Sequence, residues 1–465
     1  MQPSDEILYH HNSIGAHNGC QLMIRGIREL VAPESVGIAL PRAHVLHNIG
    51  SPVAAASLND LEIRFEDLID YRRSPLAHGG RNLLLQKEDE AFRELEKLQQ
   101  LKDNNLKPLI IDVTLPVEGR DVFVKERIHL AERLKDLNLL TVTTFELERL
   151  DEGFTRGLPS KEQSERIAKT LEAELLFGIE SGDSVAFPGA IYQQIHVTDG
   201  VLSEKEKILA QGLALAQTRT RAPLYLSFSC GESENSVLER AIRAWLGALL
   251  ALGVESKKLV FCHSDRWCRG SFGGTAYTFL QELFGLGVSV LFDMVGLLTV
   301  SDVILINPCS TSTSGSDESQ DSESLEPPSD GQLVEWIAHF VNDMPHCVSQ
   351  ILLSTNVSQR IMYRRYGGGG YTYLFEHFKP RLLRQGVTAA QWDEIVRGNV
   401  VRLLAWYVPP EAPPIPKNYL QCSICSNYFE PIEGEYFTKF TFIYCGTKCL
   451  RRHSRQKFAP LPAKQ

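Results

Sequence analysis

The stretch "LLSTNVSQRIMYRRYGGGGY", residues 352–371, joins an apolar run to a polar loop with four consecutive glycines. The apolar run ends at Leu353, and small polar side chains follow it at once. This pattern is typical of the carboxyl end of a barrel strand in an α/β enzyme, where catalytic groups usually lie. The positions at which an acid or a metal ligand is expected hold Ser354, Thr355 and Asn356 instead.

Seven other apolar runs of the strand type precede this one, and amphipathic segments such as residues 90–103 and 237–252 lie between most of them. Strands that alternate with helices indicate βα units and a parallel sheet. Eight such strands favour an α/β fold of the (β/α)8 TIM-barrel type over an open sheet. The predicted strands are residues 37–46, 108–114, 139–145, 184–192, 223–229, 258–264, 288–294 and 349–355.

The composition is that of a soluble globular protein, because 43% of the 465 residues are apolar and 23% are charged. A net charge of −9 argues against a general nucleic-acid binder. The longest apolar stretch, residues 241–254, is too short to span a membrane and contains Arg243. The first twenty residues lack the apolar core of a signal peptide, and ten scattered cysteines suit a reducing compartment. We therefore expect an intracellular protein, cytoplasmic or nuclear.

Two polar segments set the expected domain boundaries. Residues 310–331 are rich in Ser, Asp and Glu, and they predict a disordered acidic insertion in the barrel. Residues 409–418 form a Pro-rich linker. The predicted organisation is therefore an amino-terminal tail at 1–23, a barrel at 24–408, the linker, and a small module stabilised by zinc at 419–457.

Four of the ten cysteines lie in that small module in two close pairs. Cys422 and Cys425 are separated by two residues, and Cys445 and Cys449 by three. Two thiolate pairs separated by a short hairpin-like stretch suit a structural, tetrahedral zinc site. His453 is an alternative ligand, because it lies four residues after Cys449 on the same helical face. So short a module cannot bury a stable core by itself, so the metal would supply much of its folding free energy.

The phrase "YCGTKCLRRH", residues 444–453, is similar to the second half of treble-clef zinc fingers of the MYND and HIT kind. The resemblance is local, and the second zinc site that such fingers often carry is missing. Fingers of that kind mostly bind proteins, which implies a protein partner. The carboxyl-terminal tail is basic, but the interleaved aromatic residues are expected to build the core of the finger rather than to bind nucleic acid.

The barrel region resembles the phosphotriesterase-related branch of the amidohydrolase superfamily. Residues 27–46 are similar to the opening phrase of the family, which ends L-P-H-E-H-L, and residues 109–146 to its D-V-T, G-R-D and T-G segment. "LVFCHSD", residues 259–265, matches its G-H-S-D, and "YRRYGGGGY", residues 363–371, resembles its Y-G-G-H-G-Y. The order and spacing of these phrases make the resemblance specific over residues 24–406.

Members of that family hold two metal ions at the carboxyl ends of the strands. Their ligands are a His-x-His pair, a bridging carboxylated Lys or Glu, two further histidines and an Asp. Two divalent ions need several such ligands if they are to acidify a bridging water. The resemblance places the six ligand positions on Arg42, His44, Tyr192, Ser227, His263 and Asn356.

Only His44 and His263 keep the residue type of the family. Asn356 cannot act as a general base, and a cationic Arg42 would repel a divalent ion. A shift of register would let His47 replace the first histidine, but the bridge, the third histidine and the base would still be absent. Two neutral imidazoles without a carboxylate are a poor site, so no metal is expected in the barrel and no catalytic residue is expected from the family pattern.

Two functions remain open at this point. The first is a catalytically degenerate barrel that acts as a protein-interaction scaffold, with partners bound by the zinc finger or by a face of the barrel. The second is a metal-dependent hydrolase of esters, amides or phosphoesters with a rebuilt site, in which His44, His263 and an unaligned residue hold one ion. We favour the scaffold, because four of the six positions are lost.

Overall fold

A computed structural model describes residues 22–49, 63–73, 82–151, 157–230, 235–297, 328–409, 420–425, 428–432, 434, 436–455 and 457–458. The chain divides into two compact units, Met1–Val408 and Pro409–Gln465. No helix among the residues described combines the length and the apolarity needed to cross a membrane.

The first unit contains an eight-stranded parallel sheet with the order β14-β13-β12-β11-β10-β7-β6-β3. The two end strands meet: the Ser354 hydroxyl bonds the main chain of Arg42, and the His44 amide donates to the Val357 carbonyl at 2.9 Å. The predicted eight-stranded barrel is therefore confirmed. The strands are β3 (Val36–Ala43), β6 (Lys107–Asp112), β7 (Asn138–Thr143), β10 (Pro188–Val197), β11 (Leu224–Cys230), β12 (Leu259–Phe261), β13 (Ser289–Phe292) and β14 (Ile351–Leu353).

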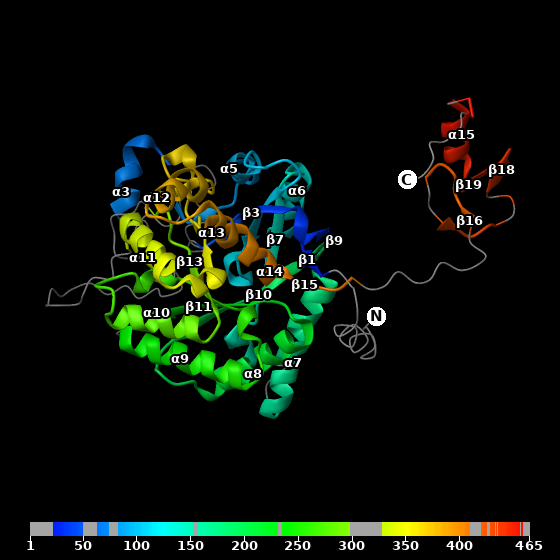
Figure 1. Cartoon of the computed structure of the whole chain (residues 1–465). Coiled ribbons are helices and arrows are strands. Elements are labelled where there is room, and N and C mark those ends of the chain that lie inside the picture. The colour runs from blue at the N-terminus through cyan, green and yellow to red at the C-terminus, as the bar shows by residue number, and fades with distance from the viewer. Residues whose placement is uncertain are drawn as a thin grey trace. The chain divides into compact units, whose positions relative to one another are not determined.

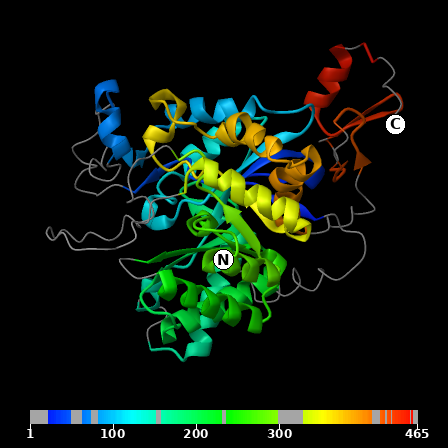
Figure 2. The same cartoon turned by 60° about the vertical axis from the view of Figure 1, so that its left-hand side comes forward.

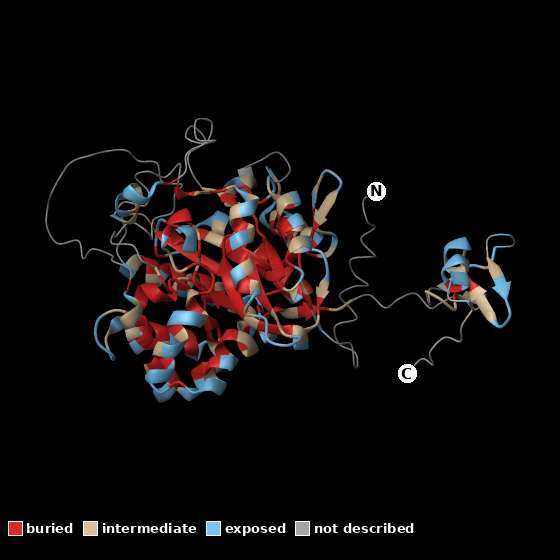
Figure 3. Cartoon of the chain, turned by 90° about the horizontal axis from the view of Figure 1, so that it is seen from above, coloured by how far each residue is buried: buried red, intermediate tan, exposed pale blue. Residues whose placement is uncertain are grey.

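Apolar side chains cover both faces of these strands, which is why the strands appear in the sequence as continuous apolar runs. Alternate residues such as Leu109, Ile111, Leu140 and Val260 fill the inside of the barrel. Their neighbours pack outward against the helices. Figure 3 shows the result, with buried residues concentrated in the strands and on the inner sides of the helices and exposed residues on the outer sides.

Helices surround the strands, as Figures 1 and 2 show from two directions. The predicted helices at 90–103 and 237–252 correspond to α5 and α9, shifted by a few residues. In Figure 2 the yellow helix α11 lies outside the strands. The helices of at least ten residues are α5 (Glu88–Gln99), α6 (Val124–Arg133), α7 (Ser160–Phe177), α8 (Glu204–Thr220), α9 (Asn235–Ala251), α10 (Thr275–Gly285) and α11 (Asp330–Asp343).

A small antiparallel sheet covers the amino-terminal ends of the barrel strands. Its strands are β1 (Met23–Arg25), β2 (Leu30–Val31) and β15 (Ala405–Tyr407). The amide of Ile27 donates to Leu139 at the start of β7, and the Trp406 indole donates to the Gly189 carbonyl at 2.8 Å. This end of the barrel is therefore closed, which leaves the carboxyl ends of the strands as the open face.

The structure differs from the predicted acidic insertion at the end of that segment. Ser329 caps α11, since its side chain accepts from the Gln332 amide. The residues just before 331 therefore begin a helix, because Ser followed three residues later by Gln forms a capping box. The preceding part of the insertion, 310–327, and the linker residues 410–418 lie outside the described residues.

The second unit contains two hairpins and one helix. β16 (Leu420–Gln421) pairs with β17 (Tyr428–Phe429), and β18 (Phe437–Lys439) pairs with β19 (Phe442–Tyr444). The helix α15 (Thr447–Arg455) follows β19. The Ser423 amide donates to the Ile443 carbonyl at 2.7 Å, so the first turn is bonded to the second hairpin.

Candidate functional site

All six residues at the family ligand positions line one pocket of about 130 Å3 at the carboxyl ends of the strands. Arg42 lies in β3, Tyr192 in β10 and Ser227 in β11, while His263 and Asn356 follow β12 and β14. Because the carboxyl ends of parallel strands meet at one end of a barrel, residues more than 300 positions apart in the chain come together here.

Four buried side chains and the half-buried His263 form a continuous set of polar contacts in this pocket. The Arg42 guanidinium donates to the Tyr192 hydroxyl at 2.8 Å and forms an ion pair with Asp293 at 3.3 Å. His263 Nδ1 lies 3.0 Å from Asp293 Oδ1, and His263 Nε2 lies 3.1 Å from Ser227 Oγ. The hydroxyls of Tyr192 and Ser227 also interact. We call these five residues the polar cluster.

The polar cluster does not suit a pair of metal ions. A guanidinium paired with a carboxylate stands at the first ligand position. A neutral phenol stands at the bridging position, where burial raises the pKa of Tyr192 to about 12. Both nitrogens of His263 are already bonded to protein atoms. Among the described residues that line the pocket, the side chains that could still bind a metal ion are too few to hold two divalent ions.

The charges of the cluster balance each other. Burial alone would lower the pKa of Arg42, but Tyr192 and Asp293 raise it above its ordinary value. Burial alone would raise the pKa of Asp293, but His263 and Arg42 lower it. Burial, assisted by Arg42, lowers the pKa of His263 although Asp293 opposes the change. The cluster at neutral pH is therefore a cationic Arg42, an anionic Asp293 and a neutral imidazole.

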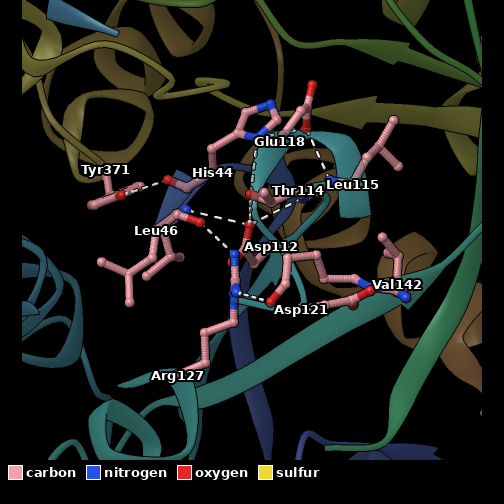
Figure 4. Close-up of polar contacts among 12 residues, drawn as sticks. His44, Leu46, Asp112, Thr114, Leu115, Glu118, Asp121, Arg127, Val142 and Tyr371 are labelled. Atoms are coloured by element: carbon pink, nitrogen blue, oxygen red, sulfur yellow. Dashed lines mark hydrogen bonds and ion pairs between the residues drawn. The ribbon is translucent and has the colours of Figure 1, made fainter. Parts of the chain in front are cut away.

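A second network supports His44 from below (Figure 4). Thr114 Oγ1 donates to Asp112 Oδ1 at 2.5 Å, so its oxygen accepts from His44 Nδ1 at 3.1 Å. Asp112 forms a buried ion pair with Arg127, whose other nitrogens donate to the carbonyls of Leu46 and Arg120. This network fixes the His44 ring and joins the loop after β3 to β6 and α6.

Glu118 lies at the edge of this network and lines the pocket. Its Oε2 accepts from the Leu115 amide at 2.9 Å and lies 3.9 Å from His44 Nδ1. Burial raises the pKa of Glu118 to about 7, although the Leu115 amide opposes the change. Burial also lowers the pKa of His44 well below its ordinary value.

Arg266 is the other cation of the pocket. Its side chain is 6% exposed, and among the described residues its hydrogen-bonding partner is Cys230 Sγ at 3.8 Å. Burial lowers the pKa of Arg266, and no described carboxylate opposes the change. The pocket therefore contains a buried positive charge that Asp293 does not pair.

The glycine run after β14 shapes the rim. Gly367 and Gly370 have positive φ angles of 77° and 63°, which favour glycine. A Cβ on Gly368 would lie 2.2 Å from the Met362 carbonyl oxygen, so the chain approaches too closely there for any side chain. Asn356 also adopts a left-handed φ of 41°. The glycine run is therefore a tight turn whose backbone angles and close contact favour glycine.

The second unit brings its four cysteines together. The ligand atoms of Cys422, Cys425, Cys445 and Cys449 all lie within 4.8 Å of one another. The sulfurs of Cys425 and Cys445 are 3.6 Å apart, and those of Cys445 and Cys449 are 3.7 Å apart. Tetrahedral zinc with bonds of about 2.3 Å places its sulfurs roughly 3.8 Å apart, so these residues fit that ion.

The environment of Cys422 also favours a thiolate. Burial would raise its pKa, but the amides of Cys425, Cys445 and Ile424 lower it to about 6. His453 is not a member of the cysteine group. It is fully buried, bonds the Tyr444 hydroxyl at 3.0 Å and contacts the ring of Phe442. The structure thus places the alternative ligand in the small core of this unit.

Comparison with known proteins follows the division into two units. A model of the phosphotriesterase family matches residues 25–404. The chain belongs to the phosphotriesterase family. A model of the Vms1-associating treble clef domain matches residues 417–461, which agrees with the predicted treble-clef finger.

Individual members of the phosphotriesterase family are distant from this chain. An N-acetyltaurine hydrolase of Homo sapiens is 22% identical over 81% of this chain and 96% of its own length. A phosphotriesterase-related protein of Nematostella vectensis is 23% identical over 81% of this chain and 97% of its own length.

Solved structures of the phosphotriesterase family share the fold. A resiniferatoxin-binding protein from Rhodobacter sphaeroides has a TM-score of 0.62 and 20% identity, with 84% of this chain and 98% of its own covered. The phosphotriesterase homology protein of Escherichia coli, complexed with phosphate in its active site, has a TM-score of 0.53 and 19% identity over 80% of this chain and 99% of its own.

Three charged residues of the pocket were not found from the sequence, namely Asp293, Glu118 and Arg266. Of these three, Asp293 could have been predicted, because it lies near the end of the predicted strand 288–294 and polar residues at the carboxyl ends of barrel strands face the open end of the barrel. Glu118 and Arg266 lie in short 3-10 helices that follow barrel strands, where the sequence carries no comparable signal for the direction of a side chain.

Proposed function

We propose that the barrel has lost the two-metal hydrolysis of the phosphotriesterase family, and that the chain acts as a scaffold through protein contacts made by its zinc finger. The polar cluster supports the loss of the metal site, because Arg42, Tyr192 and Asp293 occupy the place of the metal ions and contact one another there. The four clustered cysteines support a structural zinc ion in the finger. The partner is a protein, because the unit resembles fingers that mostly bind proteins.

A metal-dependent hydrolase with a one-metal site is the alternative. The relatives named N-acetyltaurine hydrolase and the retained His44 and His263 favour it. In the structure, however, an ion could bind His263 Nε2 only after the contact with Ser227 is broken. The alternative therefore requires the polar cluster to rearrange.

Metal content measured by mass spectrometry on the purified chain tests both proposals. We expect about one zinc per chain in the wild type and none in a Cys422→Ser/Cys449→Ser variant. One or two ions retained by this finger variant would refute the loss of the metal site. Affinity capture with wild type and the same variant tests the scaffold, since partners of the finger should be lost from the variant alone.

A further inference from the structure

Three residues of the polar cluster stand in the order of a nucleophile, a base and a group that orients the base. Ser227 Oγ lies 3.1 Å from His263 Nε2, and His263 Nδ1 lies 3.0 Å from Asp293 Oδ1. The three residues come from consecutive barrel strands, β11, β12 and β13, or from the residues just after them. Both distances lie within hydrogen-bonding reach for such a site.

The chemistry of the groups fixes where the protons lie. An ionised carboxylate only accepts hydrogen bonds, so His263 Nδ1 must carry the proton that faces Asp293. The other nitrogen of a neutral imidazole then has a free lone pair, and the Ser227 hydroxyl must donate to it. This is the tautomer and the direction of donation that activate a serine in Ser-His-Asp hydrolases.

Asp293 is held as firmly as this role requires. It is completely buried, its amide donates to Asp265 Oδ2 at 2.7 Å, and its carboxylate forms the ion pair with Arg42. His263 retains contact with the pocket, since its side chain is 20% exposed and it lines the cavity together with Ser227. The orienting group is therefore buried, while the two groups that would react face the open end of the barrel.

We propose that Ser227 is the nucleophile of a metal-independent acyl-transfer activity that accepts small esters. Ser227 Oγ forms a bond to the carbonyl carbon and gives its proton to His263 Nε2. The bond between that carbon and the leaving oxygen then breaks, and the leaving alcohol takes the proton from His263. Water, deprotonated by His263, attacks the acylated serine, the bond to Oγ breaks, Oγ recovers the proton and a carboxylic acid leaves.

The pocket favours a small substrate and places positive charge near the reacting carbonyl group. A cavity of about 130 Å3 suits a short acyl group. Negative charge that develops on the carbonyl oxygen lies in a pocket lined by the guanidinium groups of Arg42 and Arg266. The activity involves the barrel alone, so it goes beyond partner binding by the finger and does not depend on it.

The test uses the full chain, a fluorophosphonate probe that modifies activated serines, and p-nitrophenyl acetate as the ester. Intact mass followed by peptide mapping should show one adduct, located on Ser227. Ser227→Ala should abolish the adduct and lower the esterase rate by about 10²–10⁴-fold. Ser289→Ala is the matched control, because Ser289 is also buried in a barrel strand but lies at the amino end of β13, outside the pocket.

Several results would overturn the proposal. These are the absence of an adduct on Ser227 in a wild-type chain with a cooperative melting transition, an adduct on another residue, and an esterase rate unchanged by Ser227→Ala. A rate abolished by 1,10-phenanthroline would assign the activity to a metal ion instead. If Ser227→Ala fails to fold, the mapped adduct in the wild type still decides the question.

Discussion

Arg127 provides the most direct test of the network below His44. Replacing it with Met removes the cation paired with Asp112, which is completely buried, and leaves the carbonyls of Leu46 and Arg120 without their donor. Neutral donors from Thr114 and from the main chain still bond Asp112, but no positive charge remains beside it.

The expected loss of stability follows from these contacts. Breaking a buried ion pair by removing one partner costs about 3–5 kcal/mol. Two buried carbonyls that lose a hydrogen bond add about 1 kcal/mol each. The free energy of unfolding of the Arg127→Met variant should therefore fall by about 5–7 kcal/mol. Arg127→Lys should recover only part of this, because one ammonium group cannot reproduce the planar fork of donors.

Equilibrium urea unfolding followed by tryptophan fluorescence measures this loss. Arg133→Met is the matched control, since Arg133 lies in the same helix and pairs with Glu88, but its side chain is 30% exposed. An exposed pair of this kind contributes about 0–1 kcal/mol. A loss of less than about 2 kcal/mol for Arg127→Met, or a loss equal to that of Arg133→Met, would refute the reasoning.

Three further variants test other parts of the barrel. Burial raises the pKa of Glu118 to about 7 in the folded state, so the folded chain binds more protons than the unfolded chain between about pH 4.5 and 7 and loses stability as the pH rises through that window. In urea titrations, the stability of Glu118→Gln relative to wild type should therefore rise by up to about 3 kcal/mol from about pH 5 to about pH 8, and a difference that does not change with pH would contradict the raised pKa. Gly368→Ala should lower the melting temperature sharply, because its Cβ would meet the Met362 carbonyl. Gly247→Ala is the control: it lies in a helix with open space around it and should stabilise the chain by about 0.5–1 kcal/mol, and equal effects of the two changes would show that the close approach at Gly368 is unimportant. Lys258→Met removes three hydrogen bonds to the carbonyls that end α14 (Asn399–Leu404) and should cost about 1–3 kcal/mol in urea unfolding, an estimate that a loss below 0.5 kcal/mol would contradict.

The barrel could be predicted from the sequence because its signal is local. Each strand is a run of apolar residues buried on both faces, and each long helix has an apolar stripe of its own. One predicted strand was wrong in its extent. Residues 184–192 contain two strands, β9 (Ser184–Ala186) and the start of β10 (Pro188–Val197), and only Phe187 separates them.

The partners within the pocket could not be predicted in the same way. The resemblance placed Arg42 at a ligand position, but its pairing with Asp293 joins residues 251 positions apart, and the sequence of either one carries no trace of the other. The same limit holds for Ser227, His263 and Asp293, whose order depends on distances that the barrel alone sets. The four cysteines were easier, because both pairs are close in sequence and only one turn and one helix had to bring them together.

The polar cluster limits how a metal site could be built in this barrel. Introducing one ligand of the family type, for example by changing Arg42 to His, would remove the guanidinium that pairs with the buried Asp293 and leave the neutral His263 beside it. Changing Tyr192 to Glu would instead place a second carboxylate beside Arg42 with no ion to bridge. Each single change would therefore disturb the buried charge pairing of the cluster without completing a metal site. A ligand set of the family type could therefore be built in this barrel only by changing several residues of the cluster together.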